Sequence, residues 1–544
     1  MFSLNNYSGL VFCLLYFVLI CLLRAEPLAK VSQGLVQGTI LKSRNGRNIS
    51  GFIGIPYGQP PIRKLRFSSP LPAKKWDGIH LANKDGIMCP QPIEGTVIGN
   101  EDCLVLNVFT TRMKFNISTT ESANLDYYGP LYLMDQDIVL VTINYRLGLL
   151  GFLSTGDSVA PGNFGLKDQV LALKWVQKNI QVFGGDKNRV TLFGESAGGA
   201  SVTYHALSNS SRGLFHQYII HSGNALVPWG YRDRSLFKKD VNYIARHIRC
   251  PTNKSQDLID CFRKTDFHKL VNLTTYNVLD FPEILWIPTN EVESEDSFLT
   301  DSPQNLINKN KIRDYPFISG TVFDEGLYVT CPFYANSTSQ TKLNVLGRCV
   351  NGTSNRFFKP EDLSNFNKAI QSYYFNGSVS SMNEVKLLKM FTKFAGDSQF
   401  IFPNWILLEK MAKIAKSPIY SYLFDYHGQT SYAEIDYDIK NNIGVNHADE
   451  LLYIFSGVYS PLASRNDNYI IDLMVDLWTS FAINGKPSSE HLAIIDLWEP
   501  YQRSKSFLQI GNISNNTDPS VTLRQDYFTD RMNFWKENFP LLKL

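Results

Sequence analysis

The sequence predicts an α/β fold in which helices flank a mostly parallel central sheet. Three consecutive segments carry this prediction: an apolar run at 137–145, a segment with helical periodicity at 166–183, and a second apolar run at 189–193. A strand, a helix and a strand in this order imply a right-handed crossover between parallel strands.

The first run, Asp137–Tyr145, is rich in β-branched residues. A continuous apolar run of this length is typical of a strand buried on both faces. The helix expected at 166–183 ends at Gly184 and Gly185, which interrupt helical structure. Its apolar residues recur at helical spacing: Val170, Leu171, Leu173, Trp175, Val176 and Ile180.

The elements after this helix continue the α/β pattern. The strand expected at 189–193 leads through a glycine-rich turn into a helix that carries Ala200, Val202 and Leu207. Further along, the run at 316–323 is also strand-like. We therefore expect a sheet of several strands rather than an isolated strand–helix–strand unit.

The composition is that of a large globular protein. Of the 544 residues, 44% are hydrophobic, 19% are charged and 13% are aromatic, which provides a sizeable core and argues against disorder. The net charge of +3 is too small to predict nucleic acid or an anionic membrane as a partner. Since no repeat, low-complexity tract or long linker divides the chain, we expect one domain over residues 26–544.

Residues 1–25 are predicted to form a secretory signal peptide. Leu10–Leu23 is almost entirely apolar, and the small residue Ala25 suits a cleavage site. The alternative is an uncleaved membrane anchor, but the run is shorter than the ~20 residues of a spanning helix. We expect a secreted protein without a stable membrane anchor, and the oligomeric state stays open.

The number of cysteines is consistent with an exported protein. Two of the eight lie in the predicted signal, and an even number in an exported chain predicts disulfides. Six cysteines allow fifteen pairings. Because they fall into three sequential pairs that each close a short loop, we expect nearest-neighbour pairing: Cys89 with Cys103, Cys250 with Cys261, and Cys331 with Cys349.

Ten Asn-x-Ser/Thr triplets follow the predicted signal. Each triplet alone is weak, but ten in an exported chain predict a glycoprotein. The acceptor residues are Asn48, Asn116, Asn209, Asn253, Asn272, Asn336, Asn351, Asn376, Asn512 and Asn515.

Ser196 is the candidate nucleophile. It lies in a Gly-Glu-Ser-Ala-Gly-Gly sequence at 194–199, between a predicted strand and a predicted helix, which is the pattern of a nucleophile elbow. Such a turn strains the serine backbone, lifts its hydroxyl above the sheet and leaves no room for side chains two residues away. It also aims the amide of Ala197 at the oxyanion that forms during attack on a carbonyl. The alternative, a glycine-rich turn with a bystander serine, ignores the flanking elements.

Several further motifs resemble the type-B carboxylesterase family, which includes carboxylesterases and cholinesterases. They span the predicted mature chain, at residues 54–58, 66–67, 76, 101–108, 144–148, 151–154, 162–166, 168–169 and 478–487. The resemblance is closest to secreted insect carboxylesterases. It implies an α/β-hydrolase fold, hydrolysis of small carboxylic esters, and a mechanism that needs no metal or cofactor.

The resemblance also implies the rest of a catalytic triad. In this fold the acid and then the histidine follow the serine along the chain. His447 lies in a sequence, 444–450, that is similar to the family's catalytic-histidine loop. Asp324 and Glu325 both follow a predicted strand, where α/β sheets place functional groups, and the resemblance selects Glu325. Ser222 resembles a serine that supports the triad in relatives.

One motif of the family is missing. Relatives carry a strand followed by His-Gly-Gly-Gly-Phe, whose glycines donate two of the three oxyanion amides, and this chain has no such sequence. The stretch at 110–127 is polar and has no glycine, so it does not predict a buried strand. We expect the fold to lack one internal strand, with unpaired backbone groups and a hole in the core.

Two explanations of the missing motif remain open. The intact motifs around the gap favour an incomplete gene model or an exon-skipped isoform. The alternative is a weakened or inactive paralogue, because the loss of even one oxyanion donor typically lowers kcat by ~10²–10³.

The function that these observations predict is that of a secreted serine carboxylesterase. Ser196 would attack the ester carbonyl, His447 would carry the proton, Glu325 would orient the imidazole, and water would release the acyl-enzyme. The alternative is an inactive relative that binds, sequesters or adheres. The Cys89–Cys103 loop has no Trp to hold a choline cation, which disfavours an acetylcholinesterase. Juvenile hormone esterases usually carry Gln where this chain has Glu195.

Overall fold

The computed structural model of the chain describes residues 26–84, 88–93, 95–111, 125–274, 285–335, 344–348, 350, 363–377, 382–439, 441–460, 464–492, 494, 498–512 and 519–538. The predicted signal peptide, residues 1–25, lies outside the described residues.

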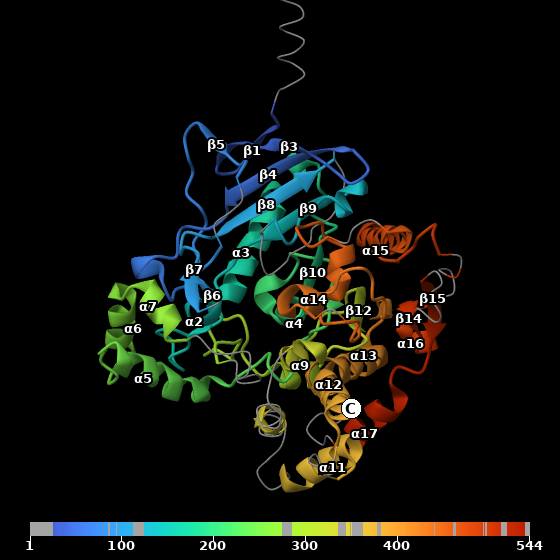
Figure 1. The fold of residues 1–544 in the computed structure, drawn as a ribbon. Helices are drawn as coiled ribbons and strands as arrows, with labels where there is room; N and C mark the ends of the chain where they lie inside the picture. The colour runs from blue at the N-terminus through green and yellow to red at the C-terminus, as the bar shows by residue number, and fades with distance from the viewer. Residues whose placement is uncertain are drawn as a thin grey trace, which may run out of the picture.

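A six-stranded sheet forms the centre of the molecule (Figure 1). Its first five strands run parallel and only the last pair is antiparallel, which confirms the predicted mostly parallel sheet. In spatial order the strands are β10 (Thr191–Glu195), β11 (Gln217–His221), β12 (Phe317–Val322), β13 (Ile419–Phe424), β14 (Phe507–Asn512) and β15 (Ser520–Arg524).

A second, antiparallel sheet is formed by the N-terminal part of the chain. Its order is β3 (Thr39–Lys42), β4 (Asn48–Pro56), β8 (Val105–Thr110) and β9 (Val139–Ile143). Two smaller sheets join β1 (Leu28–Val31), β2 (Gly34–Gln37) and β5 (Ile79–Leu81), and β6 (Gln91–Ile93) with β7 (Thr96–Ile98).

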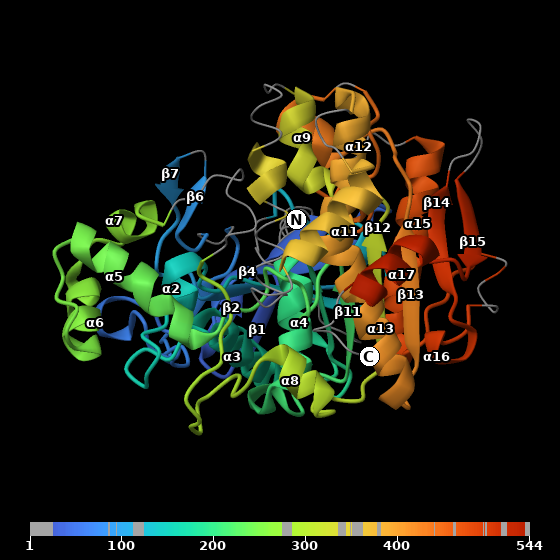
Figure 2. The ribbon, with the colours of Figure 1, turned by 90° about the horizontal axis from the view of Figure 1, so that it is seen from below.

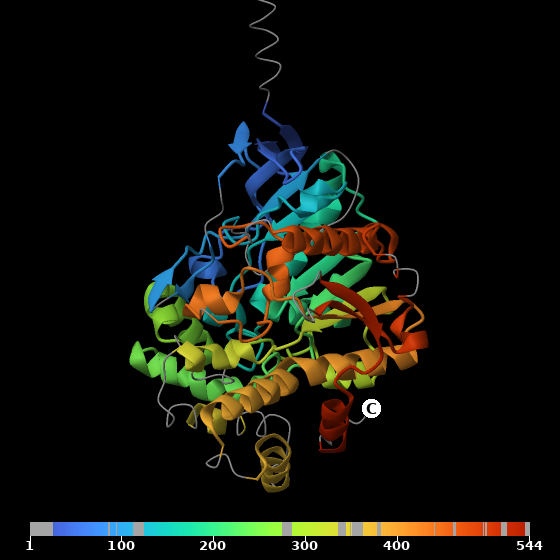
Figure 3. The same cartoon turned by 45° about the vertical axis from the view of Figure 1, so that its right-hand side comes forward.

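Helices flank the central sheet, as Figures 2 and 3 show from two further directions. They are α2 (Gly148–Phe152), α3 (Phe164–Asn179), α4 (Ala197–Leu207), α5 (Phe237–His247), α6 (Ser255–Lys264), α7 (Phe267–Asn272), α8 (Pro303–Asn308), α9 (Leu327–Ala335), α11 (Leu363–Phe375), α12 (Glu384–Gly396), α13 (Phe402–Ile414), α14 (Tyr432–Tyr437), α15 (Arg465–Asn484), α16 (Tyr501–Ser504) and α17 (Thr529–Asn538). Across the described ranges, none of the helices has the length and apolar character to cross a membrane.

The central sheet separates two apolar cores, because its strands are buried on both faces. Along β11, Tyr218 and Ile220 belong to the core that includes α3, α4 and α13, whereas Ile219 belongs to the core that includes α15. This alternation explains why the strands are continuous apolar runs in the sequence.

The elements predicted around the nucleophile are present. β9 lies within the strand predicted at 137–145. β10 overlaps the strand predicted at 189–193 and extends two residues beyond it, to Glu195. The helix predicted at 166–183 is α3, which a 3₁₀ turn, η3 (Ile180–Phe183), prolongs to the predicted end. Gly184 ends it with a φ of 85°, which glycine adopts without strain.

One expectation about these strands is wrong. The strand–helix–strand pattern predicted that β9 and β10 belong to one parallel sheet, but in the described part of the chain they end two separate sheets. β9 pairs antiparallel with β8, and β10 pairs only with β11. The break agrees with the predicted lack of one internal strand.

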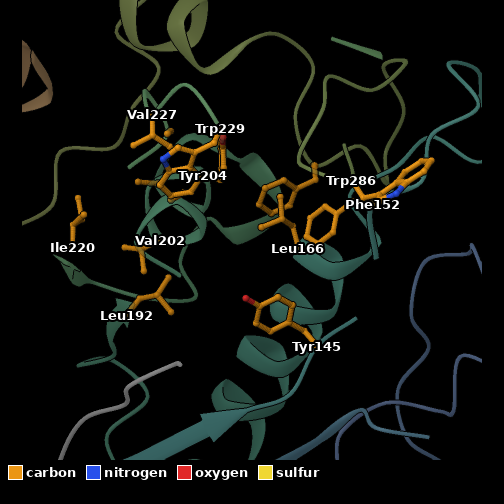
Figure 4. Close-up of a cluster of buried hydrophobic side chains, with 14 of the residues drawn as sticks. Tyr145, Phe152, Leu166, Leu192, Val202, Tyr204, Ile220, Val227, Trp229 and Trp286 are labelled. Atoms are coloured by element: carbon orange, nitrogen blue, oxygen red, sulfur yellow. The ribbon is translucent and has the colours of Figure 1, made fainter. Parts of the chain in front are cut away.

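Side chains occupy the space between β9 and β10. On one face Phe193 of β10 stacks on Phe455, with ring centroids 5.7 Å apart. On the other face, between β9, β10, α3 and α4, only a narrow hollow of about 10 Å³ remains, roughly the space of one water molecule. Figure 4 shows three residues that line it, Tyr145, Leu192 and Val202. The hole that the sequence predicts in the core is therefore small at this place.

Two of the three expected disulfides are formed, Cys89–Cys103 and Cys250–Cys261. The expectation for Cys331 is wrong, because it is a free, buried cysteine. It lies in α9 and packs in a small apolar cluster with Leu327, Ala433 and Ile439, where burial raises the pKa of its thiol. Its expected partner, Cys349, lies outside the described residues.

Five of the predicted glycosylation acceptors are exposed: Asn48, Asn209, Asn253, Asn272 and Asn376. Exposure is what a glycosylated side chain requires. Asn116, Asn336, Asn351, Asn515 and the side chain of Asn512 lie outside the described residues.

Four of the family motifs supply the residues of two buried ion pairs. Arg66 makes a bidentate contact with Glu101, with both N–O distances at 2.6 Å. Arg146 holds Asp168 in the same manner, at 2.7 and 2.8 Å, and both side chains are almost completely buried. These motif residues support the scaffold and do not contact the candidate nucleophile.

Replacing Asp168 with alanine should lower the free energy of unfolding by about 3–5 kcal/mol, because it leaves the buried guanidinium of Arg146 without its carboxylate. Denaturation in urea measures the change. Asp260→Ala is the matched control, since Asp260 is half exposed beside Arg263 and its loss should leave the free energy of unfolding nearly unchanged. Equal losses in the two variants would contradict a stabilising role for the buried pair.

Candidate active site

Ser196 lies at the sharp turn between β10 and α4. Its backbone has φ 55° and ψ −116°, a strained conformation for a residue other than glycine. The turn requires Gly194, because a Cβ atom there would lie 2.5 Å from the carbonyl carbon of Gly198. The backbone amide of Ser196 donates to the carbonyl of His221 at 2.9 Å, which ties the turn to β11. This is the geometry that the sequence predicts for a nucleophile elbow.

Ala197 is the first residue of α4. The amide of a residue in this position has no acceptor within its helix and can donate to a ligand instead. Ala197 is exposed and Ser196 is partly exposed, so this side of the turn is open to solvent.

Glu325 and His447 are brought together although 122 residues separate them. Glu325 lies in the turn after β12, and its Oε2 is 2.6 Å from Nδ1 of His447. Its Oε1 accepts a hydrogen bond from the backbone amide of Val322 at 3.0 Å. Both side chains are buried, so the carboxylate fixes the orientation of the imidazole.

The neighbouring acid, Asp324, has a different partner. Its Oδ2 accepts a hydrogen bond from the amide of Val445, and its own amide donates to the carbonyl of Val445, both at 3.2 Å. Gly444 allows this approach, because a Cβ atom there would collide with the Asp324 carboxylate. Asp324 therefore holds the loop that carries His447, and Glu325 contacts the imidazole itself.

The second nitrogen of His447 contacts an unexpected group. Its Nε2 lies 3.1 Å from Oε1 of Glu195, the residue before the candidate nucleophile. No hydrogen bond joins Ser196 to His447 within the described ranges. The side chain of Glu195 is 14% exposed, so the contact is largely shielded from water. Sequence reasoning did not identify this pair, because a position beside a serine does not reveal where the glutamate side chain points.

The surrounding carboxylates change the ionisation of His447. Burial alone lowers the pKa of the imidazole, but Glu195, Glu325 and Glu450 raise it, and the result is a pKa of about 9. The imidazole is therefore mainly protonated at neutral pH. In this state His447 cannot accept a proton from a serine hydroxyl, so a role as general base would require that it first loses its own proton.

The predicted supporting serine, Ser222, follows β11 and is completely buried. Its backbone has φ 47°, and its amide donates to the carbonyl of Gly320 at 3.0 Å. Its hydroxyl has no hydrogen-bond partner among the described residues. The side chain therefore does not contact Glu325 or His447 through a hydrogen bond in this arrangement.

A buried polar network lies beside Glu325 and His447. Glu450 contacts His221 at 3.1 Å, and the other nitrogen of His221 accepts a hydrogen bond from the indole of Trp478 at 2.7 Å. The hydroxyl of Tyr422 is 2.9 Å from His221. The network connects the loop of His447 to β11, β13 and α15, and it places a third carboxylate near the imidazole.

The site contains no candidate metal centre. Among the residues whose positions the structure describes, no group of three or more His, Cys, Asp or Glu side chains is arranged to hold a metal ion.

Comparison with a family model and comparison with individual proteins identify the same family. The model of the carboxylesterase family matches residues 25–535. The chain is 33% identical to a juvenile hormone esterase of Tribolium castaneum, over 95% of each chain. It is 34% identical to a carboxylic ester hydrolase of Bombus ignitus, over 94% of this chain and 93% of the relative. It is also 33% identical to esterase FE4 of Myzus persicae, over 93% of each chain.

Replacing Glu195 with glutamine should lower the pKa of His447 from about 9 by roughly one to three units, because it removes a negative charge at nearly constant size. Histidine NMR titration of the labelled protein measures the pKa. Glu293→Gln serves as the control, since Glu293 is exposed. An unchanged pKa in the Glu195 variant would show that another group keeps the imidazole protonated.

Proposed function

The chain belongs to the carboxylesterase family, and on this premise we propose that it is a secreted serine carboxylesterase that works through an acyl-enzyme. The observation that carries the proposal is the 2.6 Å contact between Glu325 and His447, in a site whose other carboxylate directly precedes Ser196 at the nucleophile elbow. Ester hydrolysis itself follows from the family.

The proposed reaction begins when His447 is neutral. Nε2 then accepts the proton of the Ser196 hydroxyl while its oxygen attacks the ester carbonyl. Glu325 stabilises the imidazolium that forms, and the proton passes to the leaving alcohol. Water attacks the acyl-enzyme in the same manner and releases the carboxylic acid. The amide of Ala197 is the oxyanion donor that this chain retains in its elbow.

Glu195 has to release His447 during this cycle. At rest, Nε2 carries a proton and contacts the Glu195 carboxylate. After deprotonation Nε2 becomes an acceptor, its attraction to a carboxylate is lost, and it is free to turn to the Ser196 hydroxyl. Activity should therefore rise with pH up to the pKa of about 9.

Secretion is part of the proposal. The apolar N-terminal segment, five exposed sequons and two disulfides are the features that support it. The substrates are small carboxylic esters, in agreement with the relatives. A binding or sequestering role without turnover is not favoured by these relatives, and the following experiment separates it from the esterase.

We expect the secreted protein to hydrolyse p-nitrophenyl acetate and butyrate slowly, with repeated turnover. The rate should increase about tenfold per pH unit below pH 9, because the neutral fraction of His447 increases in this proportion. Glu195→Gln should shift this profile to lower pH. Product release in excess of enzyme, followed across pH 6–10, is the measurement.

Ser196→Ala is the control for the chemistry, and labelling with a fluorophosphonate reports the reactivity of the serine. Turnover that persists in Ser196→Ala would place the reaction elsewhere. Labelling of Ser196 without turnover would support the sequestering role. If the folded protein shows neither labelling nor turnover, the proposed esterase is contradicted.

A further inference from the structure

A second cavity lies close to the triad and is formed mostly by residues outside it. It measures about 190 Å³, which is far more than one water molecule needs. Its walls come from the turn after β12, from α12 with the π turn Asp397–Ile401, and from the start of α17. Figure 1 shows α12 and α17 close together below the central sheet.

Two cationic side chains line this cavity. Arg531 has one nitrogen 3.2 Å from the buried carboxylate of Asp397, and its guanidinium lies 3.9 Å from the centre of the Phe528 ring. A guanidinium carries five N–H donors, so this contact leaves donors for a ligand. Lys393 is exposed and has no ion pair within the described ranges.

Apolar side chains form the rest of the wall. The rings of Phe323 and Phe528 meet edge to face, with centroids 5.4 Å apart, and Ile401 is 1% exposed. The cavity thus combines two cations with an apolar surface. This combination suits a ligand that has an anionic head and a short hydrocarbon tail.

Two carboxylates, Asp324 and Glu325, also line the cavity and would repel an anionic ligand, but their hydrogen-bond partners weaken this repulsion. Both oxygens of Glu325 already have partners, the imidazole of His447 and the amide of Val322. Asp324 accepts a hydrogen bond from Val445. Burial raises the pKa of Asp324 above its ordinary value, although the hydrogen bond from Val445 and the charges of Arg531 and the neighbouring lysines act in the opposite direction. Asp324 is therefore the group that an anionic ligand has to face, and its charge should weaken binding.

We propose that this cavity binds a short-chain monocarboxylate, with Arg531 and Lys393 holding the carboxylate and Phe323, Ile401 and Phe528 contacting the alkyl chain. A bidentate contact from Arg531 and a single contact from Lys393 match the donors that a carboxylate accepts. Carboxylic acids are also the acyl products of an esterase. This connection rests on the proposed function, but the binding itself does not.

Isothermal titration calorimetry of the full secreted protein with sodium butyrate tests the proposal, with acetate, inorganic phosphate and butylammonium as comparisons. Butyrate should bind more tightly than acetate or phosphate, and butylammonium should not bind. Because binding is measured without any ester, failure of the proposed esterase would leave this result unaffected.

Variants place the binding in the cavity. Lys393→Gln should weaken butyrate binding about tenfold, because it removes a charge-assisted hydrogen bond. Arg531→Lys keeps the charge next to Asp397 but loses the bidentate geometry, and it should also weaken binding. Asp324→Asn should tighten binding. Lys536→Gln, an exposed lysine on α17, is the matched control and should have no effect.

The opposite directions of these effects keep the test decisive even if one variant folds poorly. Butyrate binding that survives unchanged in Lys393→Gln and Arg531→Lys, binding of phosphate as tight as that of butyrate, or no binding at all would overturn the proposal.

Discussion

The imidazole of His447 lies between two carboxylates that come from the ends of different strands. Glu195 ends β10 and Glu325 follows β12, so the contacts at 3.1 and 2.6 Å form only when the parallel strands are in register. A third carboxylate, Glu450, raises the pKa of the imidazole from a greater distance. The charge of His447 therefore depends on the whole central sheet, and through it the basicity of the candidate site depends on the fold.

The central sheet keeps this geometry although it is not continuous with the N-terminal sheet. β10 has β11 as its only strand partner among the described residues. The backbone of Ser196 after β10 nevertheless has the strained conformation that is typical of a nucleophile elbow. Two local features explain this result. Gly194 permits close contact with Gly198, and the amide of Ser196 is bonded to His221 of β11. The elbow is thus fixed from the β11 side and by its own helix, so a break on the β9 side does not disturb it.

The sequence predicted the features that depend on local pattern. The apolar runs identified β9, β10 and β12, and the glycines around Ser196 identified the elbow, because each follows from neighbouring residues alone. The resemblance to the family supplied Glu325 and His447. The contact between Glu195 and His447 could not be predicted in this manner, because it depends on side-chain directions in two segments 252 positions apart in the numbering. The same limit applies to Cys331, whose direction into an apolar cluster cannot be recognised from loop length.

In the proposed serine mechanism two features would lower the rate, and their magnitudes can be compared. With a pKa of about 9, only about one His447 in a hundred is neutral at pH 7, which costs on the order of 3 kcal/mol of activation free energy. One oxyanion donor contributes about 2.7–4 kcal/mol, and the absent His-Gly-Gly-Gly motif would supply two. In that mechanism the absence of the two donors would be the larger loss, and raising the pH would restore only the smaller one. A carboxylate at Glu195 also opposes the negative charge that forms at the substrate carbonyl, but it stabilises the imidazolium that forms in the same step. In the proposed mechanism, with Ala197 as the oxyanion donor of the elbow, the repulsion would be only partly compensated. Glu195 would then stabilise the resting site, with protonated His447, more than the transition state.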